Sequence, residues 1–337
     1  MVTTEPVEQE TPQPPAEPTR RLPRVQIRNF VDRFGILVAW LLVAIVFSIL
    51  EPSSFFTTAS FSTIFGSQAV LLILSLALLV PLTVGEFDLS VTGSMSMANI
   101  LIGFLNIRHG WPIAAAVAVA LGWGLLIGVV NVVFVMLFRV ESIVVTLGSG
   151  TLWIGVGYGL QPSNLAGVTS VLVDVTRTNL LGLPLAFWYG LGLTILAWYV
   201  FSYTPLGRYL YFVGANRQVS RLSGIPVSSI RGGSLIVSAV VSAGAGVVLA
   251  GTLDASSPSI SIAYLLPAFA AVFLGATAIT PGRFNPWGTF IAVYFLITGI
   301  TGLEYFGLAG WIENVFYGAS LVLAVALSRL AARQQEA

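Results

Sequence analysis

The stretch AVLLILSLALLVPLTV (69–84), followed at once by GEFDLSV (85–91), decides what kind of fold this chain can have. The first part is apolar and uncharged. With the residues just before it, this part fills the roughly 20 positions that a membrane-spanning helix needs. The second part brings a glycine and two acids, Glu86 and Asp88, to the end of that run. An acid in a membrane segment is costly, so these two need a structural or functional reason.

The composition of the whole chain also indicates a membrane protein. Of its 337 residues, 56% are hydrophobic and 9% are charged, and the mean hydropathy is +0.91. Soluble domains carry about 25% charged residues. A single soluble core could not bury so much apolar surface, so the bilayer is the expected solvent. The net charge of +1 gives no sign of a nucleic-acid partner.

Missing residue types exclude several kinds of chemistry. The absence of cysteine excludes disulfides, thiolate metal sites and cysteine nucleophiles. The single histidine, His109, argues against a histidine metal site or a Ser/His triad. The absence of lysine excludes the phosphate-binding loop G-x-x-x-x-G-K-[ST]. If ATP drives this protein, another polypeptide hydrolyses it, and we expect this chain to bind no metal or cofactor of its own.

Apolar runs of helix length predict an all-α polytopic membrane protein, because helices satisfy their own backbone groups in hydrocarbon. Residues 1–33 are expected to form a cytoplasmic tail, disordered at first and basic towards its end, and residues 34–330 the transmembrane domain. The ten expected spans are 34–50, 62–84, 89–107, 112–138, 143–160, 184–202, 233–253, 262–279, 286–303 and 308–328.

Arginine positions predict the orientation of these spans, since cytoplasmic loops carry an excess of basic residues. With the N-terminus inside and the spans alternating, every arginine except Arg108 and Arg177 lies on the cytoplasmic side. Both termini are therefore expected in the cytoplasm.

The segment TPLGRYLYFVGANRQVSRLSGIPVSSIR (204–231) is the longest polar stretch expected inside after the tail. It predicts a short helix over 217–223. Asn216 can cap its N-terminus, and Gly224 can take the left-handed conformation that stops it, with Pro226 preventing continuation.

This short helix has an apolar and a basic side. Val219 and Leu222 form the apolar side, and Arg217 and Arg221 lie on the polar one. On physical grounds alone, such a helix either docks into a groove of a partner or lies on anionic lipid.

The same loop resembles the cytoplasmic loop of the sugar-type ABC importer permeases, those for ribose, xylose and arabinose. Their pattern is roughly T-x-x-G-R-x-x-x-A-x-G-x-N-x-x-A-A-x-x-S-G-I-x-V, and Val219 and Ser220 replace its paired alanines. In that family the loop contacts the ATPase subunit, so the resemblance favours docking over lipid. The implied docking residues are Gly214, Asn216, Arg217, Arg221, Ser223, Gly224 and Ile225.

Two further motifs extend the resemblance over about residues 34–330. GEFDLSV is similar to the family's G-G-I-D-L-S-V-G-S, with Glu86 and Phe87 replacing the second Gly and the Ile. The stretch LLPAFAAVFLGATAITPGRFNPWGT (265–289) is similar to A-A-V-x-L-G-G-T-S-x-x-G-G-x-G-S-x-x-G-T. The three motifs imply the family's fold and its coupling to an ATPase, and they leave the solute unnamed.

The two acids allow alternative interpretations. Asp88 either caps a helix that starts at Leu89 or acts directly in transport, and Glu86 is either a functional intramembrane acid or an exposed loop acid. The tetrapeptide at 85–88 also lines up with GRFN at 282–285, which suggests a salt bridge between Glu86 and Arg283. Asn99 and Asn131 either bond across helices or line a path for a polar solute. The candidate residues of the helix break and the pathway are Gly85, Glu86, Asp88, Ser90, Asn99, Asn131, Gly275, Gly282 and Arg283.

These observations predict the multi-pass permease subunit of an ATP-driven ABC importer in a bacterial plasma membrane, not an enzyme. The resemblance implies three partners: an ABC ATPase subunit, a periplasmic or lipid-anchored solute-binding protein, and a second permease copy or a paralogue. The expected solute is a monosaccharide or a related polyol. One rival is an ABC permease for branched-chain amino acids. Another is an ion-coupled secondary carrier, which would need a charged relay at mid-membrane.

Overall fold

The computed structural model describes residues 24–55, 57–308 and 310–336. The segment 1–19, predicted to be disordered, lies outside them. The first helix begins at Arg24, so the last part of the predicted basic tail is helical instead. The helices are α1 (Arg24–Leu50), α2 (Thr58–Ser67), α3 (Ala69–Thr83), α4 (Val91–Ile102), η1 (Gly103–Arg108), α5 (Ile113–Val132), η2 (Val133–Leu137), α6 (Ser142–Leu160), α7 (Ser170–Arg177), α8 (Leu185–Tyr203), α9 (Pro205–Ala215), α10 (Arg217–Leu222), α11 (Val227–Leu253), η3 (Ile260–Tyr264), α12 (Leu265–Gly275), α13 (Pro286–Tyr305) and α14 (Trp311–Glu336).

The fold is an all-α polytopic membrane protein, as predicted. Within the described residues, seven helical stretches are long and apolar enough to cross a membrane. They fall in Arg33–Leu50, Ser60–Thr83, Ile113–Leu137, Ser142–Leu160, Leu185–Tyr203, Val227–Leu253 and Pro286–Tyr305. The other three predicted spans contain α4 with η1, η3 with α12, and α14; the apolar stretches of the last two, Ile260–Gly275 and Trp311–Ala326, are shorter than the seven.

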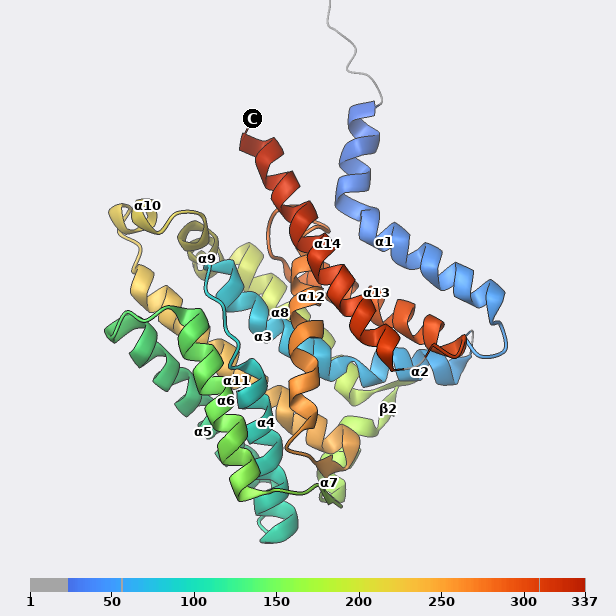
Figure 1. Ribbon diagram of the computed structural model, residues 1–337, viewed down its shortest axis with the longest axis vertical. Helices are drawn as coiled ribbons and strands as arrows, with labels where there is room; N and C mark the ends of the chain where they lie inside the picture. Colours follow the sequence, from blue (N-terminus) through green and yellow to red (C-terminus); the bar gives the residue numbers. More distant parts are fainter. Residues whose placement is uncertain (1–23, 56, 309, 337) are drawn as a thin grey trace, which may run out of the picture.

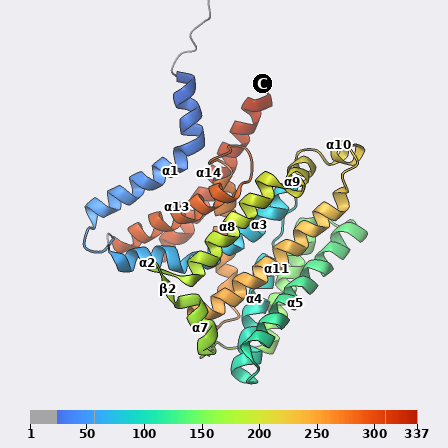
Figure 2. The same cartoon turned by 180° about the vertical axis from the view of Figure 1, so that it is seen from behind.

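The centre of the molecule is built from the apolar stretch 69–84 and the helix that follows it. Every residue of α3 except Val80 is buried, and so is every residue of α4. Helix α11 packs against α3, α4 and α5, while α12 packs against α3, α13 and α14 (Figures 1 and 2). Helix α1 runs along the outside against α13, and Leu41, Leu42 and Ile49 are exposed on it. The side chains in the centre therefore meet protein, and those outside meet the bilayer.

Glycines set the close crossing of α4 and α6. A β-carbon on Gly93 would lie 2.8 Å from the Cα of Gly150, and one on Gly150 would lie 3.1 Å from the carbonyl oxygen of Leu89. Small residues at such crossings let helix backbones approach closely, which is how helices pack where lipid supplies no hydrophobic drive.

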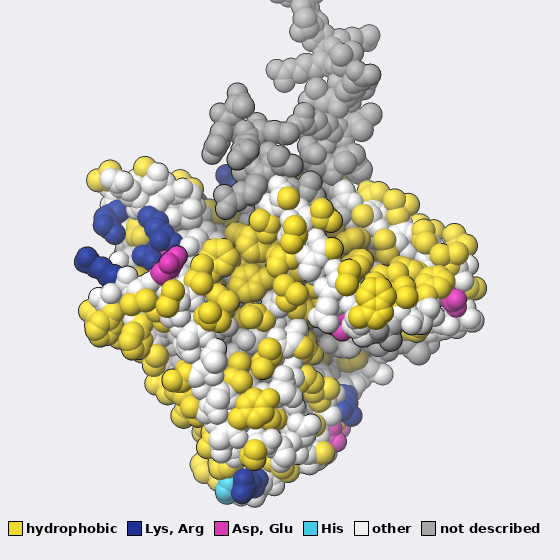
Figure 3. Space-filling view, viewed as in Figure 1, with side chains coloured by type: hydrophobic (Ala, Val, Ile, Leu, Met, Phe, Trp, Pro, Cys, Tyr) yellow, Lys and Arg dark blue, Asp and Glu magenta, His cyan; other side chains and the backbone are white. Residues whose placement is uncertain are grey.

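The two ends of the molecule differ in composition. One end carries α9 and α10 and also the C-terminus (Figure 1), and a group of arginine side chains gathers there over α10 (Figure 3). The opposite end carries α7 and four two-residue strands. β1 (Leu165–Ala166) pairs antiparallel with β4 (Ala255–Ser256), and β2 (Asn179–Leu180) with β3 (Leu183–Pro184). The surface between the two ends is mainly hydrophobic (Figure 3).

Candidate functional site

The seven residues Val84–Ser90, which we call the break loop, connect α3 to α4. Helix α3 ends because Gly85 adopts a left-handed conformation, with φ of +74°, which glycine takes without steric cost. The chain then runs through Glu86 and Asp88, and α4 begins at Val91. The helix break predicted from GEFDLSV is thus present.

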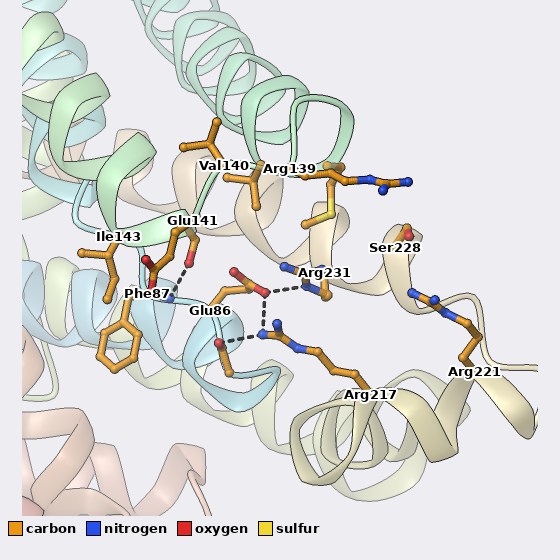
Figure 4. Close-up of a pocket in the computed structure, with 14 residues that line it drawn as sticks. Glu86, Phe87, Arg139, Val140, Glu141, Ile143, Arg217, Arg221, Ser228 and Arg231 are labelled. Carbon is orange, nitrogen blue, oxygen red and sulfur yellow. Dashed lines mark hydrogen bonds and ion pairs between the residues drawn. The ribbon is translucent and has the colours of Figure 1, made fainter.

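The carboxylate of Glu86 joins three elements. Its side chain is 2% exposed, and its Oε1 accepts from Nη2 of Arg217 at 2.6 Å and from Nε of Arg231 at 2.5 Å (Figure 4). Arg217 is the first residue of α10 and Arg231 lies in α11. Two guanidinium groups supply the charge and the hydrogen bonds that a buried carboxylate requires.

Arg217 also binds the end of α3 directly. Its Nη2 donates to the carbonyl oxygen of Gly85 at 2.8 Å and to that of Val84 at 3.4 Å. Carbonyls at a helix C-terminus lack partners within the helix and carry partial negative charge, which a cation stabilises. One arginine of α10 therefore holds both the carboxylate and the helix end.

The predicted salt bridge between Glu86 and Arg283 is wrong. Arg283 instead lies over the ring of Tyr211, 5.7 Å from the ring centroid. The alignment of the two tetrapeptides is nevertheless visible in the backbone, because Gly282 is left-handed like Gly85. The aromatic residues of the two turns, Phe87 and Phe284, both contact the ring of Phe273, with centroids at 6.5 and 5.4 Å. The two turns therefore meet through Phe273, while their charged residues point to different neighbours.

Asp88 does not cap a helix at Leu89 as predicted, because α4 starts two residues later with Ser90 as its N-cap. Its Oδ1 accepts from the backbone N–H of Ser90 at 2.9 Å and from the Ser90 hydroxyl at 2.6 Å. This is a local turn stabilised by an aspartate. The Oδ2 atom is buried without a hydrogen-bond partner. Burial raises the pKa of the Asp88 carboxyl, and the hydrogen bonds from serine oppose that rise.

The break loop is also bound to α5 and α6. The amide of Asn131 in α5 donates to the hydroxyl of Ser90 at 2.8 Å. Ser142 and Thr146 of α6 accept from the backbone N–H groups of Phe87 and Leu89 at 3.3 and 3.0 Å. Ser142, Thr146 and Arg231 were not predicted from the sequence as site residues. Ser142 and Thr146 lie four apart on one helix face in the first turns after a loop, which was the only signal available.

The predicted short helix is confirmed as α10. The side chain of Asn216 accepts from the backbone N–H groups of Gln218 and Val219, both at 3.0 Å. Gly224 is left-handed with φ of +79°, and Ser223 and Ile225 complete the turn through bonds to Val219 and Ser220. The helix before it, α9, was not predicted, although Thr204 caps it and Pro205 opens it.

Gly214 at the end of α9 touches the end of α3, so the segment 204–231 and the break loop are adjacent. The apolar side of α10 is open: Leu222 is 83% exposed and Val219 is 57% exposed.

A pocket of about 640 Å³ opens where these elements meet (Figure 4). Its charged lining residues are Glu86, Glu141, Arg139, Arg217, Arg221 and Arg231. Four cations against two carboxylates make the pocket basic. A second pocket of about 670 Å³ lies on the other side of Gly85 and is lined by Arg208, Tyr211, Gly214, Gly282 and Arg283, among others.

The remaining candidates lie apart from the break loop. Asn99 accepts from the backbone N–H of Ser257 at 2.8 Å and donates to Gly246 at 3.5 Å, so it bonds across helices. Gly275 packs against α13, where its added β-carbon would lie 2.5 Å from the nitrogen of Thr289. Within the described residues, no three His, Cys, Asp or Glu side chains gather in a way that could hold a metal ion.

Comparison with known proteins finds permeases of transport systems. A family model described as "Branched-chain amino acid transport system / permease component" matches residues 60–325. The chain is similar to the autoinducer 2 import system permease protein LsrD of Photorhabdus luminescens, with 27% identity over 262 residues, which are 75% of this chain and 78% of the relative.

Two further relatives are the D-allose transport system permease protein AlsC of Escherichia coli and the ribose import permease protein RbsC of Haemophilus influenzae. AlsC is 24% identical over 302 residues, or 89% of this chain and 93% of the relative. RbsC is 25% identical over 276 residues, or 80% and 85%.

Proposed function

The chain belongs to the family of branched-chain amino acid transport system permease components, and from this premise we propose that it forms the translocation pathway of an ATP-driven importer for a monosaccharide or a related polyol. The observation that carries the choice of solute is the set of names of its relatives. Allose and ribose are monosaccharides, and none of the three relatives reported above is named for an amino acid. The chain is a transporter subunit and not an enzyme.

In the proposed arrangement the chain crosses a bacterial inner membrane ten times, and both termini lie in the cytoplasm. The distribution of arginine supports it, and so does the position of the C-terminus at the same end as α10 (Figure 1). Residues 34–330 would form the permease domain. The importer would contain a second permease copy or a paralogue, and a solute-binding protein would deliver the solute from outside.

The loop 204–231 would dock an ABC ATPase subunit, which binds ATP and Mg²⁺ in place of this chain. Helix α10 has the required chemistry, because exposed Leu222 and Val219 lie beside Arg221. We expect the ATPase to offer an apolar groove with acidic residues at its rim. Exposed leucine anchors of this kind supply much of the binding energy of a helix in a groove.

Purification in mild detergent tests this function. The chain is extracted from its native membranes, and the proteins that co-purify are identified by mass. We expect an ABC ATPase, and we expect Leu222→Asp to lose it while inserting normally. The matched control is Leu181→Asp, which changes a residue 84% exposed in the β2–β3 turn and should keep the ATPase. If no ATPase accompanies the unaltered chain, the proposed function is wrong. If Leu222→Asp retains it, α10 lies on lipid instead.

A further inference from the structure

The break loop is the place where the docking helix, α11 and α6 are joined. Glu86 binds Arg217 of α10 and Arg231 of α11 through the same oxygen atom. One residue further on, the N–H of Phe87 donates to Ser142 of α6. A path of direct bonds thus runs from α10 through the loop into α6.

The first half of this path is held by buried charge. Glu86 is 2% exposed, whereas Arg217 is 44% exposed and Arg231 is 22% exposed. Separating the carboxylate from its arginines would leave it desolvated and unpaired, which is strongly unfavourable. Arg217 supplies one of the two ion pairs of Glu86 and also donates to the carbonyl oxygen of Gly85, so a movement of α10 pulls on the break loop through both contacts.

The second half of the path is held by backbone. Thr146 accepts from the N–H of Leu89 at 3.0 Å, and its hydroxyl lies 2.7 Å from the carbonyl oxygen of Ser142 and 3.2 Å from that of Phe87. The loop also packs closely on α6, where a β-carbon on Gly150 would lie 3.1 Å from both the carbonyl oxygen of Leu89 and the Cα of Ser90. A displacement of the loop therefore displaces the start of α6.

We propose that Glu86 is the positioning residue that transmits a movement of the docking helix α10 to α6. The inference rests on the proposed function, because the ATPase is what would move α10. Glu86 makes no contact with ATP or with the ATPase in this scheme. Its role is to make α10 and the break loop move as one body.

Distances between spin labels test this transmission. The sequence contains no cysteine, so labels can be attached at introduced cysteines alone. One pair, Gln218→Cys with Leu181→Cys, reports on α10, because Gln218 is an exposed residue of that helix outside its apolar side. A second pair, Val144→Cys with Leu181→Cys, reports on α6, where Val144 is 60% exposed. The complex with its co-purified ATPase is measured without nucleotide and after trapping with ATP and vanadate.

In the parent complex we expect both distances to change on trapping. In Glu86→Gln we expect the change at α10 to remain and the change at α6 to be lost. Arg217→Gln should give the same result. It is the milder variant, because Arg231 still neutralises Glu86 and the fold keeps its buried ion pair. The matched control is Glu141→Gln, an acid of the same pocket, which should behave as the parent.

Each outcome of these measurements either supports the transmitting role of Glu86 or overturns it. Loss of the α6 change in both variants, with unaltered unfolding temperature and ATPase retention, supports the transmitting role. A full α6 change in Glu86→Gln and Arg217→Gln would overturn it, and so would a parent complex in which α10 moves but α6 does not. A parent chain that brings down no ATPase would overturn the proposed function itself, and this inference with it.

Discussion

Gly214 of α9 lies so close to Thr83 of α3 that a β-carbon on Gly214 would fall 1.9 Å from the carbonyl oxygen of Thr83. Only glycine fits there. The contact places the end of α9 beside the end of α3, one residue before the cap at Val84. It therefore sets the position from which Arg217, three residues later, reaches the break loop.

We expect Gly214→Ala to destabilise the protein, because the clash is with backbone, which cannot rotate away. Overpacking of this kind costs about 1–3 kcal/mol. Unfolding temperature in detergent measures the loss. The matched control is Gly233→Ala in α11, where an added β-carbon meets nothing within 4 Å. It should be neutral or slightly stabilising, since alanine is the better helix former. Equal effects at the two positions would contradict the packing described for α9.

Gly224→Ala should loosen the end of α10 without unfolding the protein. The left-handed conformation at φ of +79° costs a residue with a β-carbon about 1–2 kcal/mol. The bonds that close this turn, from Gly224 to Arg221 and from Ile225 to Ser220, should open about tenfold more often, since about 1.4 kcal/mol is tenfold. Amide hydrogen exchange over residues 220–225 measures this. Gly224→Asn should show a smaller increase because asparagine tolerates this conformation better, and unchanged exchange in both variants would refute the assignment.

Local signals in the sequence predicted the features that are formed locally. Asn216 and Gly224 announce the two ends of α10 because a cap and a left-handed stop involve neighbours only. Runs of apolar residues likewise predicted the membrane helices, because such a run consists of consecutive residues and depends on no distant partner. The break in the segment 62–84, where Gln68 separates α2 from α3, has no comparably clear residue, so one helix was predicted where two exist.

The partners of Glu86 could not be found in this way. Arg217 and Arg231 lie 131 and 145 positions away in the chain, and only tertiary packing brings them to the same oxygen. The internal similarity of GEFD and GRFN suggested Arg283 instead. That similarity is real in the backbone turns at Gly85 and Gly282, but a shared turn does not decide which way a long side chain extends.

Substitutions of Asn285 test the structure of the turn that begins at Gly282. Its Oδ1 caps α13 by accepting from Gly288 at 2.7 Å, and its Nδ2 donates to the carbonyls of Ala278 and Arg283 at 3.0 and 3.1 Å. Asn285→Asp keeps the acceptor but faces those carbonyls with a carboxylate. We expect it to cost more than Asn285→Ser, which loses the donors alone at about 1–3 kcal/mol. The unfolding temperatures of the two variants measure this difference. An Asp variant more stable than the Ser variant would contradict the hydrogen bonds described for Asn285.

Asp88 should make stability depend on pH. Its pKa in the folded protein is raised by burial, and an unfolded aspartate titrates near 3.9. Its contribution is therefore complete below about pH 4 and is lost as pH rises through the folded pKa. Asp88→Asn does not titrate, so the unfolding temperature of the parent relative to this variant should be highest near about pH 4 and fall towards neutral pH. If the unfolding temperature of the parent relative to the variant grew with rising pH, that result would contradict a buried Asp88 carboxyl with a raised pKa.

The most direct test of the central claim is solute uptake with the energy source controlled. Right-side-out membrane vesicles containing this chain are loaded with ATP, supplied with periplasmic extract, and given radiolabelled ribose, allose, xylose or arabinose in turn. We predict uptake of at least one sugar that requires internal ATP, survives a protonophore and disappears in Leu222→Asp vesicles. Uptake that continues without ATP and collapses with the protonophore would show an ion-coupled carrier and contradict an ATP-driven importer.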